Sequence, residues 1–441
     1  MRNGHFDDAA REYVIDTPAT PLPWINYLGD EDFFSLISNT GGYSFYKDAK
    51  LRRITRYRYN NVPADTGARN YYVSVMSGSG EDARPVETFS PTFLPAKTPL
   101  DSYTCRHGIA STQMEDGSAW HQYQQLTKKG NADIGGSVFI GGMFVLYGGQ
   151  YADALEHYGT TVGMGEDEAK AEAAAVREAV ADMGEAVKTA GWDGEWFVRA
   201  YDAYSRPIGS HIDTEGRIFI EPQGMCVMAG IGLEDGKAQA ALASARDRLT
   251  CERGTAILAP AYSTYRIELG EISTYPRGYK ENGGIFCHNN PWISIANAVA
   301  GNDEEAFAVY RRNCPAWLED KSEIRKVEPY VYCQMVAGPE AAIPGEGKNS
   351  WLTGTAAWTF VDVSQYLLGV RPTLDGLLVE PHLPAEYDDL TVTRVYRGVT
   401  YRIAMRRTGE RTLTVDGTPV AGNVVPVPAD GVDTVDVAVT F

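Results

Sequence analysis

The chain has 441 residues, 44% hydrophobic and 22% charged, which is the composition of a folded globular protein and excludes wholesale disorder. With 40 Lys and Arg against 58 Asp and Glu, the formal net charge is −18, which disfavours nucleic acid and anionic membranes as partners. The 26 Tyr and 8 Trp offer flat faces that suit sugar rings, although such residues also fill ordinary cores.

Residues 1–16 have neither the apolar core of a signal peptide nor a small-residue cleavage site, and no run of about 18 apolar residues occurs. The six cysteines form no C-x-x-C pair and no Cys/His cluster at metal-binding spacing. We therefore expect a cytoplasmic protein with reduced thiols and no metal site.

Short β-branched and aromatic runs between Gly, Asn and Asp clusters predict strands near the N-terminus, at residues 33–38, 43–46, 51–59 and 71–76. From about Glu115, apolar residues recur at spacings of three and four, which predicts helices. The expected helices cover residues 167–190, 235–249, 302–314 and 355–368.

After Arg371 the chain returns to short strands, expected at residues 377–379, 390–396, 401–405, 413–415 and 432–441. The order β, α, β predicts three domains, at residues 1–112, 113–370 and 371–441. Helices in series, joined by loops rich in aromatic and polar residues, suit an α/α toroid whose loops gather at one mouth.

One loop, residues 269–292, concentrates polar groups beside aromatic ones. It contains Glu271, Tyr275, Lys280, Glu281 and His288, and its glycines permit close backbone approach. A solvated, charged loop explains each of these residues taken singly, whereas their concentration favours a binding site.

Two further segments are candidates. Thr353 and Gly354 stand at the start of an expected helix, whose N–H groups and dipole favour an anion such as phosphate, although a plain Thr N-cap explains them equally well. Residues 116–131 mix aromatic and polar side chains, as a solvated loop also does. The absence of G-x-S-x-G, P-loop, H-E-x-x-H and G-x-G-x-x-G motifs weighs against serine hydrolases, P-loop NTPases, zincins and nicotinamide enzymes.

Long stretches of the chain match one family pattern, among them HQYQQLTKKGN, GWDGEWFVRAYD, FIEPQGMCVMAGIG, LGEISTYPRGYKENGGIFCHNNPW and KNSWLTGTAAW. They resemble the cellobiose phosphorylases, the inverting disaccharide phosphorylases of the cellobiose/chitobiose group. The resemblance implies an N-terminal β-sandwich, an (α/α)6 barrel that holds the site, and a small C-terminal β domain. It also implies the reversible reaction of cellobiose with phosphate, giving α-D-glucose 1-phosphate and D-glucose with inversion.

The resemblance assigns roles to individual residues and names the partners. By this resemblance, the phosphate ligands are His288, Thr353 and Gly354. Gln334 resembles a residue that holds the transferred glucosyl unit. The residues that resemble ligands of the departing glucose are Glu271, Tyr275 and Lys280. The implied ligands are a β-linked disaccharide and inorganic phosphate as co-substrate, and family members usually form homodimers. Such an enzyme needs only one catalytic carboxylic acid, which protonates the glycosidic oxygen. Phosphate is already anionic, so no second carboxylate is needed to activate the nucleophile as an inverting hydrolase activates water.

This sequence departs from the family pattern in two places. Family members are nearly twice as long, and near residues 111–116 the chain passes from sandwich sequence directly to a mid-barrel motif. Near Asp133–Ser137 it jumps again, where the Trp-Asn-bracketed general-acid aspartate is expected, and no D-W-N-D occurs in the chain. We therefore expect a truncated β-sandwich, an incomplete (α/α)6 barrel with exposed apolar faces, and no identified catalytic acid.

Three hypotheses follow, in order of preference. In the first, the chain is an inactive or barely active phosphorylase with two internal deletions. In the second, it is a reduced but working enzyme in which another carboxylate, Glu271 or Glu281, has taken the acid role. In the third, it is a non-catalytic remnant that binds sugar or phosphate, or a partner of an intact subunit.

Overall fold

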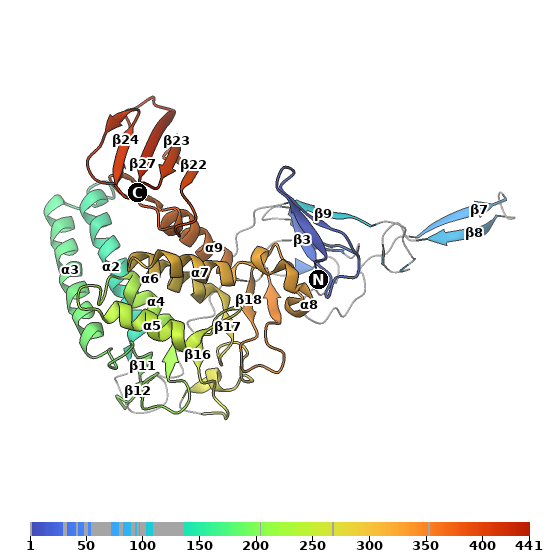
Figure 1. Ribbon diagram of the computed structural model, residues 1–441, viewed down its shortest axis with the longest axis horizontal. Helices are drawn as coiled ribbons and strands as arrows, with labels where there is room; N and C mark the ends of the chain where they lie inside the picture. The colour runs from blue at the N-terminus through green and yellow to red at the C-terminus, as the bar shows by residue number, and fades with distance from the viewer. Residues whose placement is uncertain are drawn as a thin grey trace. The chain divides into compact units, whose positions relative to one another are not determined.

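The computed structural model describes residues 2–29, 33–40, 43–47, 52–53, 72–78, 83–89, 93–94, 97, 103–108, 136–202, 204–266, 269–351 and 353–441. The chain divides into two compact units (Figure 1). The first comprises residues 1–116, 314–336 and 345–354, and the second comprises residues 117–313, 337–344 and 355–441. The three-domain division expected from the sequence stays a prediction.

The N-terminal part of the first unit consists of short antiparallel sheets. They are β1 (Gly4–Asp7), β2 (Glu12–Ile15) and β9 (Cys105–Gly108); β3 (Ile25–Gly29), β4 (Phe33–Ser38), β5 (Tyr43–Lys47) and β6 (Arg52–Arg53); and the ribbon of β7 (Val73–Ser77) and β8 (Arg84–Phe89). The strands predicted at 33–38, 43–46 and 71–76 are confirmed as β4, β5 and β7. Within the predicted strand 51–59, the structure describes only β6, and the rest lies outside the described residues.

A segment from much later in the chain completes this unit. It contributes η4 (Pro315–Lys321), α8 (Ser322–Arg325), β18 (Cys333–Val336) and β19 (Gly347–Ser350). The Tyr13 hydroxyl donates to Glu319 Oε1 at 2.9 Å, and Trp24 Nε1 donates to the Lys326 carbonyl at 3.0 Å. Tyr330 packs against both aromatic rings, so the N-terminal strands share one core with residues more than 300 positions away.

The second unit is mainly helical. Its helices are α2 (Val138–Tyr158), α3 (Glu166–Thr189), α4 (Ile220–Met228), α5 (Lys237–Leu249), α6 (Asn290–Val299), α7 (Asp303–Asn313), and α9 (Thr355–Val361), which continues into the π-helix η5 (Asp362–Leu367). The helices predicted at 167–190, 235–249, 302–314 and 355–368 are confirmed as α3, α5, α7, and α9 with η5. The periodicity did not predict α2, α4 and α6.

Short elements connect these helices and carry the loops. They are β10 (Gly136–Ser137), β11 (Ala200–Tyr201), β12 (Pro207–Ile208), β13 (Ile218–Phe219), β14 (Thr250–Cys251), β15 (Gly254–Thr255), β16 (Leu258–Ala259), η2 (Gly270–Ser273), β17 (Ile285–Phe286) and η3 (Cys287–Asn289).

Glycines set the packing of α2, which lies beside α3 in Figure 1. A Cβ atom on Gly141 or Gly148 would approach Val187 or Val180 of α3 to 2.8 or 2.7 Å. One on Gly142 would approach Cys226 Sγ of α4 to 2.9 Å. Because these positions carry no side chain, α2 packs closely against both α3 and α4.

The chain ends in a sheet of five strands, ordered β22-β23-β27-β24-β25, next to a smaller sheet ordered β20-β21-β26. Their bounds are β20 (Val370–Pro372), β21 (Gly376–Val379), β22 (Asp389–Tyr396), β23 (Val399–Arg406), β24 (Thr412–Val415), β25 (Thr418–Pro419), β26 (Val424–Pro426) and β27 (Thr434–Thr440). All five strands predicted after Arg371 are confirmed. Alternate residues such as Ile403 and Val437 are buried, as a sheet with one solvated face requires.

One carboxyl group lies in the helical core without a cation beside it among the described residues. Asp362, in η5, is 1% exposed, and Ser294 Oγ of α6 donates to its Oδ1 at 2.8 Å. Burial raises the pKa of Asp362 well above its ordinary value. The ionised form therefore destabilises the folded state at neutral pH.

Asp362→Asn keeps an acceptor for Ser294 and removes the charge, so we expect it to raise the free energy of unfolding at pH 7 by about 1–3 kcal/mol. The folded pKa lies above the unfolded one, so the penalty grows as pH rises through the unfolded value of 3.8. The gain should therefore shrink towards pH 4 in urea denaturation. Asp389→Asn, at an exposed position, is the control. A variant less stable than wild type at both pH values would contradict this account.

Candidate functional site

The loop that follows η2 gathers three of the predicted groups. Glu271 is exposed in η2, while Tyr275, Lys280 and Glu281 are half-buried. Burial raises the pKa of Tyr275, and the charges of Glu281 and Glu271 raise it further. The phenol and the two carboxylates are thus close enough to interact, as a site for sugar hydroxyls requires.

A buried amide fixes the backbone of this loop. Asn282 is fully buried; its Oδ1 accepts from Tyr262 N at 2.7 Å, and its Nδ2 donates to the carbonyls of Tyr262 and Tyr275 at 3.0 and 2.8 Å. Tyr275 is therefore anchored through its main chain while its side chain stays half-buried. The sequence analysis did not identify Asn282, because hydrogen bonding to the main chain leaves no spacing pattern.

Gly278 brings the same loop against a second segment. Its φ angle is +78°, and its carbonyl accepts from Gly338 N at 2.8 Å. A Cβ atom on Gly278 would lie 2.2 Å from Ala341 N, so only glycine fits. Lys280, two residues later, also has a positive φ angle, +50°.

His288 lies in η3, half-buried among aromatic rings. Its ring is 4.8 Å from Phe286 and 5.5 Å from Trp292, centroid to centroid. Trp292 in turn contacts the rings of Phe139 and Trp358, each with a centroid separation of 5.5 Å. An imidazole is thus held at the edge of an aromatic cluster that joins α2, α6 and α9.

Several polar atoms on these elements are buried without a hydrogen-bond partner among the described residues; they are Asn289 Oδ1, Trp292 Nε1 and Thr359 Oγ1. Buried polar groups of native proteins normally bond to protein, water or a ligand. Trp292 and Thr359 can donate, so an anion or a hydroxyl group would satisfy them. Sequence reasoning missed all three residues, since burial without a partner has no sequence signal.

The remaining predicted ligands belong to the first unit. Gln334, on β18, accepts through Oε1 from Asn349 Nδ2 of β19 at 2.9 Å. Thr353 and Gly354 directly precede α9, and a Cβ atom on Gly354 would meet nothing within 4 Å. The structure thus brings Glu271 and Tyr275 together in the second unit, and a single site that also includes Gln334, Thr353 and Gly354 stays a prediction.

Two predicted features lie outside the described residues: the loop 116–131, and most of the segment around Asp133–Ser137 where the general acid is expected. In the part of the chain that is described, no three His, Cys, Asp or Glu side chains are placed to hold a metal ion. Likewise, no described helix is long and apolar enough to cross a bilayer.

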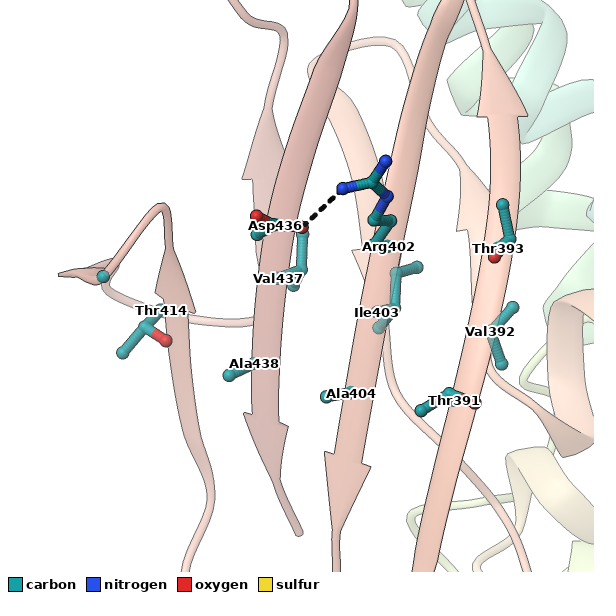
Figure 2. A pocket seen from close by; sticks show the side chains of 11 residues that line it. Thr391, Val392, Thr393, Arg402, Ile403, Ala404, Thr414, Asp436, Val437 and Ala438 are labelled. Carbon is teal, nitrogen blue, oxygen red and sulfur yellow. Dashed lines mark ion pairs between the residues drawn. The ribbon is translucent and has the colours of Figure 1, made fainter.

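A shallow depression of about 530 Å³ lies on the exposed face of the C-terminal sheet. Figure 2 shows its threonines and alanines beside the ion pair of Arg402 with Asp436, whose closest atoms are 4.0 Å apart. It has no aromatic side chain, and no predicted site residue lines it, so it does not fit a sugar-ring site.

Comparison with known families gives two matches. Residues 127–369 match the catalytic domain of the glycosyl hydrolase 94 superfamily, and residues 11–120 match the glycosyl hydrolase 94 supersandwich domain. The fold thus comprises a supersandwich domain, a helical catalytic domain and a C-terminal sheet.

The chain is 32% identical over 342 residues to solabiose phosphorylase of Paenibacillus borealis, covering 71% of this chain and 44% of that one. It is 32% identical over 256 residues to N,N'-diacetylchitobiose phosphorylase of Vibrio proteolyticus, covering 56% and 32%. It is also 32% identical over 239 residues to cyclic beta-(1,2)-glucan synthase NdvB of Rhizobium meliloti (strain 1021), covering 53% and 8%.

The chain therefore spans less than half the length of these relatives. The names of the relatives specify different substrates and different reactions. The match over 127–369 covers more than half of this chain. The predicted resemblance to the disaccharide phosphorylase family is confirmed: the chain belongs to the glycosyl hydrolase 94 superfamily.

Proposed function

We propose that this chain binds a β-linked glucosyl disaccharide together with inorganic phosphate, in the manner of a disaccharide phosphorylase. The expected substrate is cellobiose, giving α-D-glucose 1-phosphate and D-glucose with inversion. The observation that carries the proposal is the catalytic-domain match, whose residues include the Glu271, Tyr275 and Glu281 cluster and the aromatic surroundings of His288.

In this proposal His288, Thr353 and Gly354 bind phosphate. Imidazole and main-chain N–H groups donate to its oxygens. Trp292 Nε1 and Thr359 Oγ1, which are buried without a hydrogen-bond partner among the described residues, support a bound anion. Gln334 holds the transferred glucosyl unit, while Glu271, Tyr275 and Lys280 bind the departing glucose. No organic cofactor or metal takes part, and the protein acts in the cytoplasm as a homodimer.

Turnover is slow in this proposal, because the expected general acid is absent from the sequence and the barrel is incomplete. A positioned acid contributes roughly 10²–10⁴ to the rate. Enzymes commonly turn over at about 1–1,000 s⁻¹, so we expect phosphorolysis well below about 1 s⁻¹.

The test is release of α-glucose 1-phosphate from cellobiose by the purified chain, with a phosphate-free control and calorimetric titration of each ligand. Slow, phosphate-dependent release with measurable binding is expected. Release at ordinary enzymatic rates would contradict the loss of the acid, and replacing Glu271 and Glu281 in turn would then identify the substitute. Absence of both release and binding, in a protein folded by circular dichroism, would overturn the proposal.

His288→Ala should weaken phosphate binding about 10- to 100-fold, because a hydrogen bond to a charged group contributes about 1.5–3 kcal/mol. Titration calorimetry with phosphate measures this loss. His5→Ala removes an exposed imidazole in β1 and is the matched control. Equal affinities of all three proteins for phosphate would exclude His288 as a ligand.

A second candidate function is non-catalytic binding of sugar or phosphate, as a remnant or as the partner of an intact subunit. The missing D-W-N-D motif favours it. Binding of cellobiose without any release of product would select this candidate.

A further inference from the structure

A cross-strand hydrogen bond holds one end of the Gln334 carboxamide. In the antiparallel pair of β18 and β19, Cys333 pairs with Ser350, so the next residues along the two strands, Gln334 and Asn349, stand opposite each other. Both side chains are half-buried, and Asn349 Nδ2 donates to Gln334 Oε1 at 2.9 Å. The proposed holder of the glucosyl unit is therefore itself held by a neighbouring amide.

The backbone at Asn349 has an unusual conformation for a residue in a strand. Its φ angle is +53°, in the left-handed region that glycine adopts at no steric cost and that asparagine tolerates better than most residues. Glycine at this position would relax the backbone but would lose the bond to Gln334. The asparagine thus accepts a conformational cost, and its side-chain amide is what it offers in return.

Both flanks of Asn349 are anchored to carboxylates. On one side, Lys348 Nζ lies 2.7 Å from Glu346 Oε2. On the other, Trp351 Nε1 donates to the buried Glu328 at 3.3 Å. Because the strand is fixed on both sides, the amide of Asn349 can impose an orientation on its partner rather than follow it.

We propose that Asn349 is a positioning residue, which turns the carboxamide of Gln334 so that its N–H donors face an oxygen of the glucosyl unit. This inference rests on the role of Gln334 in the proposed function. A carboxamide has an acceptor at one end and two donors at the other. With Oε1 accepting from Asn349, the sugar meets the Nε2 end, whose two donors can bond to protein and sugar at once.

The test is calorimetric titration of the full chain with cellobiose. Asn349→Gly suits the backbone at this φ angle and frees the amide of Gln334 to turn, so affinity should fall about 3- to 10-fold. Asn349→Asp keeps the size of the side chain but can only accept, so it draws the NH₂ group and turns the carbonyl oxygen towards the sugar. We expect this variant to lose more than the glycine variant, about tenfold or more.

The same substitutions in a Gln334→Ala background separate positioning from a structural role. Without the amide to orient, each should change cellobiose affinity by less than about twofold. Ser205→Gly is the matched control, because Ser205 is exposed and has a φ angle of +58°, and it should bind cellobiose like wild type. Asn349→Gly should bind inorganic phosphate like wild type, and circular dichroism confirms that each variant is folded.

Three results overturn the inference. They are an Asn349→Asp variant that binds cellobiose as tightly as wild type, losses that persist undiminished in the Gln334→Ala background, and an equal loss of phosphate affinity in Asn349→Gly. Failure of the proposed function looks different. In that case Gln334→Ala binds cellobiose as well as wild type, or no protein of the series binds it, and the inference falls with the function.

Discussion

Gly278→Ala is expected to unfold the loop that carries Tyr275 and Lys280, with a loss of stability above about 3 kcal/mol. Two costs add. The residue has φ +78°, where a side chain costs about 1–2 kcal/mol. In addition, the new Cβ would lie 2.2 Å from Ala341 N and 2.6 Å from Ala341 Cα, so main chain must move. Urea denaturation measures the loss, and calorimetry with cellobiose measures its effect on binding.

Gly301→Ala separates the two costs. Gly301 has nearly the same φ angle, +77°, but a Cβ atom there would meet nothing within 4 Å. We expect it to lose only the conformational cost. Equal destabilisation by both substitutions would show that the approach of Gly278 to Ala341 contributes nothing.

Replacing Glu328 with Ala is expected to destabilise the first unit by a comparable amount. Glu328 is 3% exposed, and its Oε1 accepts from Ile25 N at 3.0 Å and from Trp351 Nε1 at 3.3 Å. Glu328→Ala removes the acceptor of the buried Ile25 N–H and of the half-buried Trp351 Nε1–H, at up to about 1–3 kcal/mol each, so we expect a loss of about 2–6 kcal/mol in urea denaturation.

Glu328→Gln is the matched variant. Burial raises the pKa of Glu328, which means that the protein disfavours its charge and uses its capacity to accept hydrogen bonds. The amide keeps an acceptor oxygen, so its stability at pH 7 should equal or exceed that of wild type. If Glu328→Gln lost as much stability as Glu328→Ala, the negative charge of Glu328 would be what stabilises this part of the fold.

Two of the helices that the sequence predicted, α3 and α5, each have one solvated face. In α3 and α5 buried residues alternate with exposed ones at helical spacing, so periodicity reveals them. In α4 every residue is buried, and in α6 all but the last, so no polar face interrupts the pattern. A helix enclosed on all sides therefore looks, in sequence, like an undifferentiated apolar run.

The candidate site was predictable only where its chemistry is local in the chain. Glu271, Tyr275 and Glu281 stand in one loop, and the structure places them close together. Asn282 supports that loop, and Trp292 Nε1 beside His288 is buried without a hydrogen-bond partner among the described residues; both features depend on burial between distant segments. Spacing along the sequence carries no information about such contacts.

The completion of the first unit by residues 314–354 has a consequence for synthesis of the protein. Hydrogen bonds join the Tyr13 and Trp24 side chains and the Ile25 N–H to residues 319–328, which are made far later in translation. At about 5–20 residues per second, the ribosome needs roughly 15–60 s to make the intervening chain. Throughout that interval Tyr13 and Trp24 lack these hydrogen-bond partners and the packing of Tyr330, so the core of the first unit is incomplete and more open to chaperone binding and aggregation.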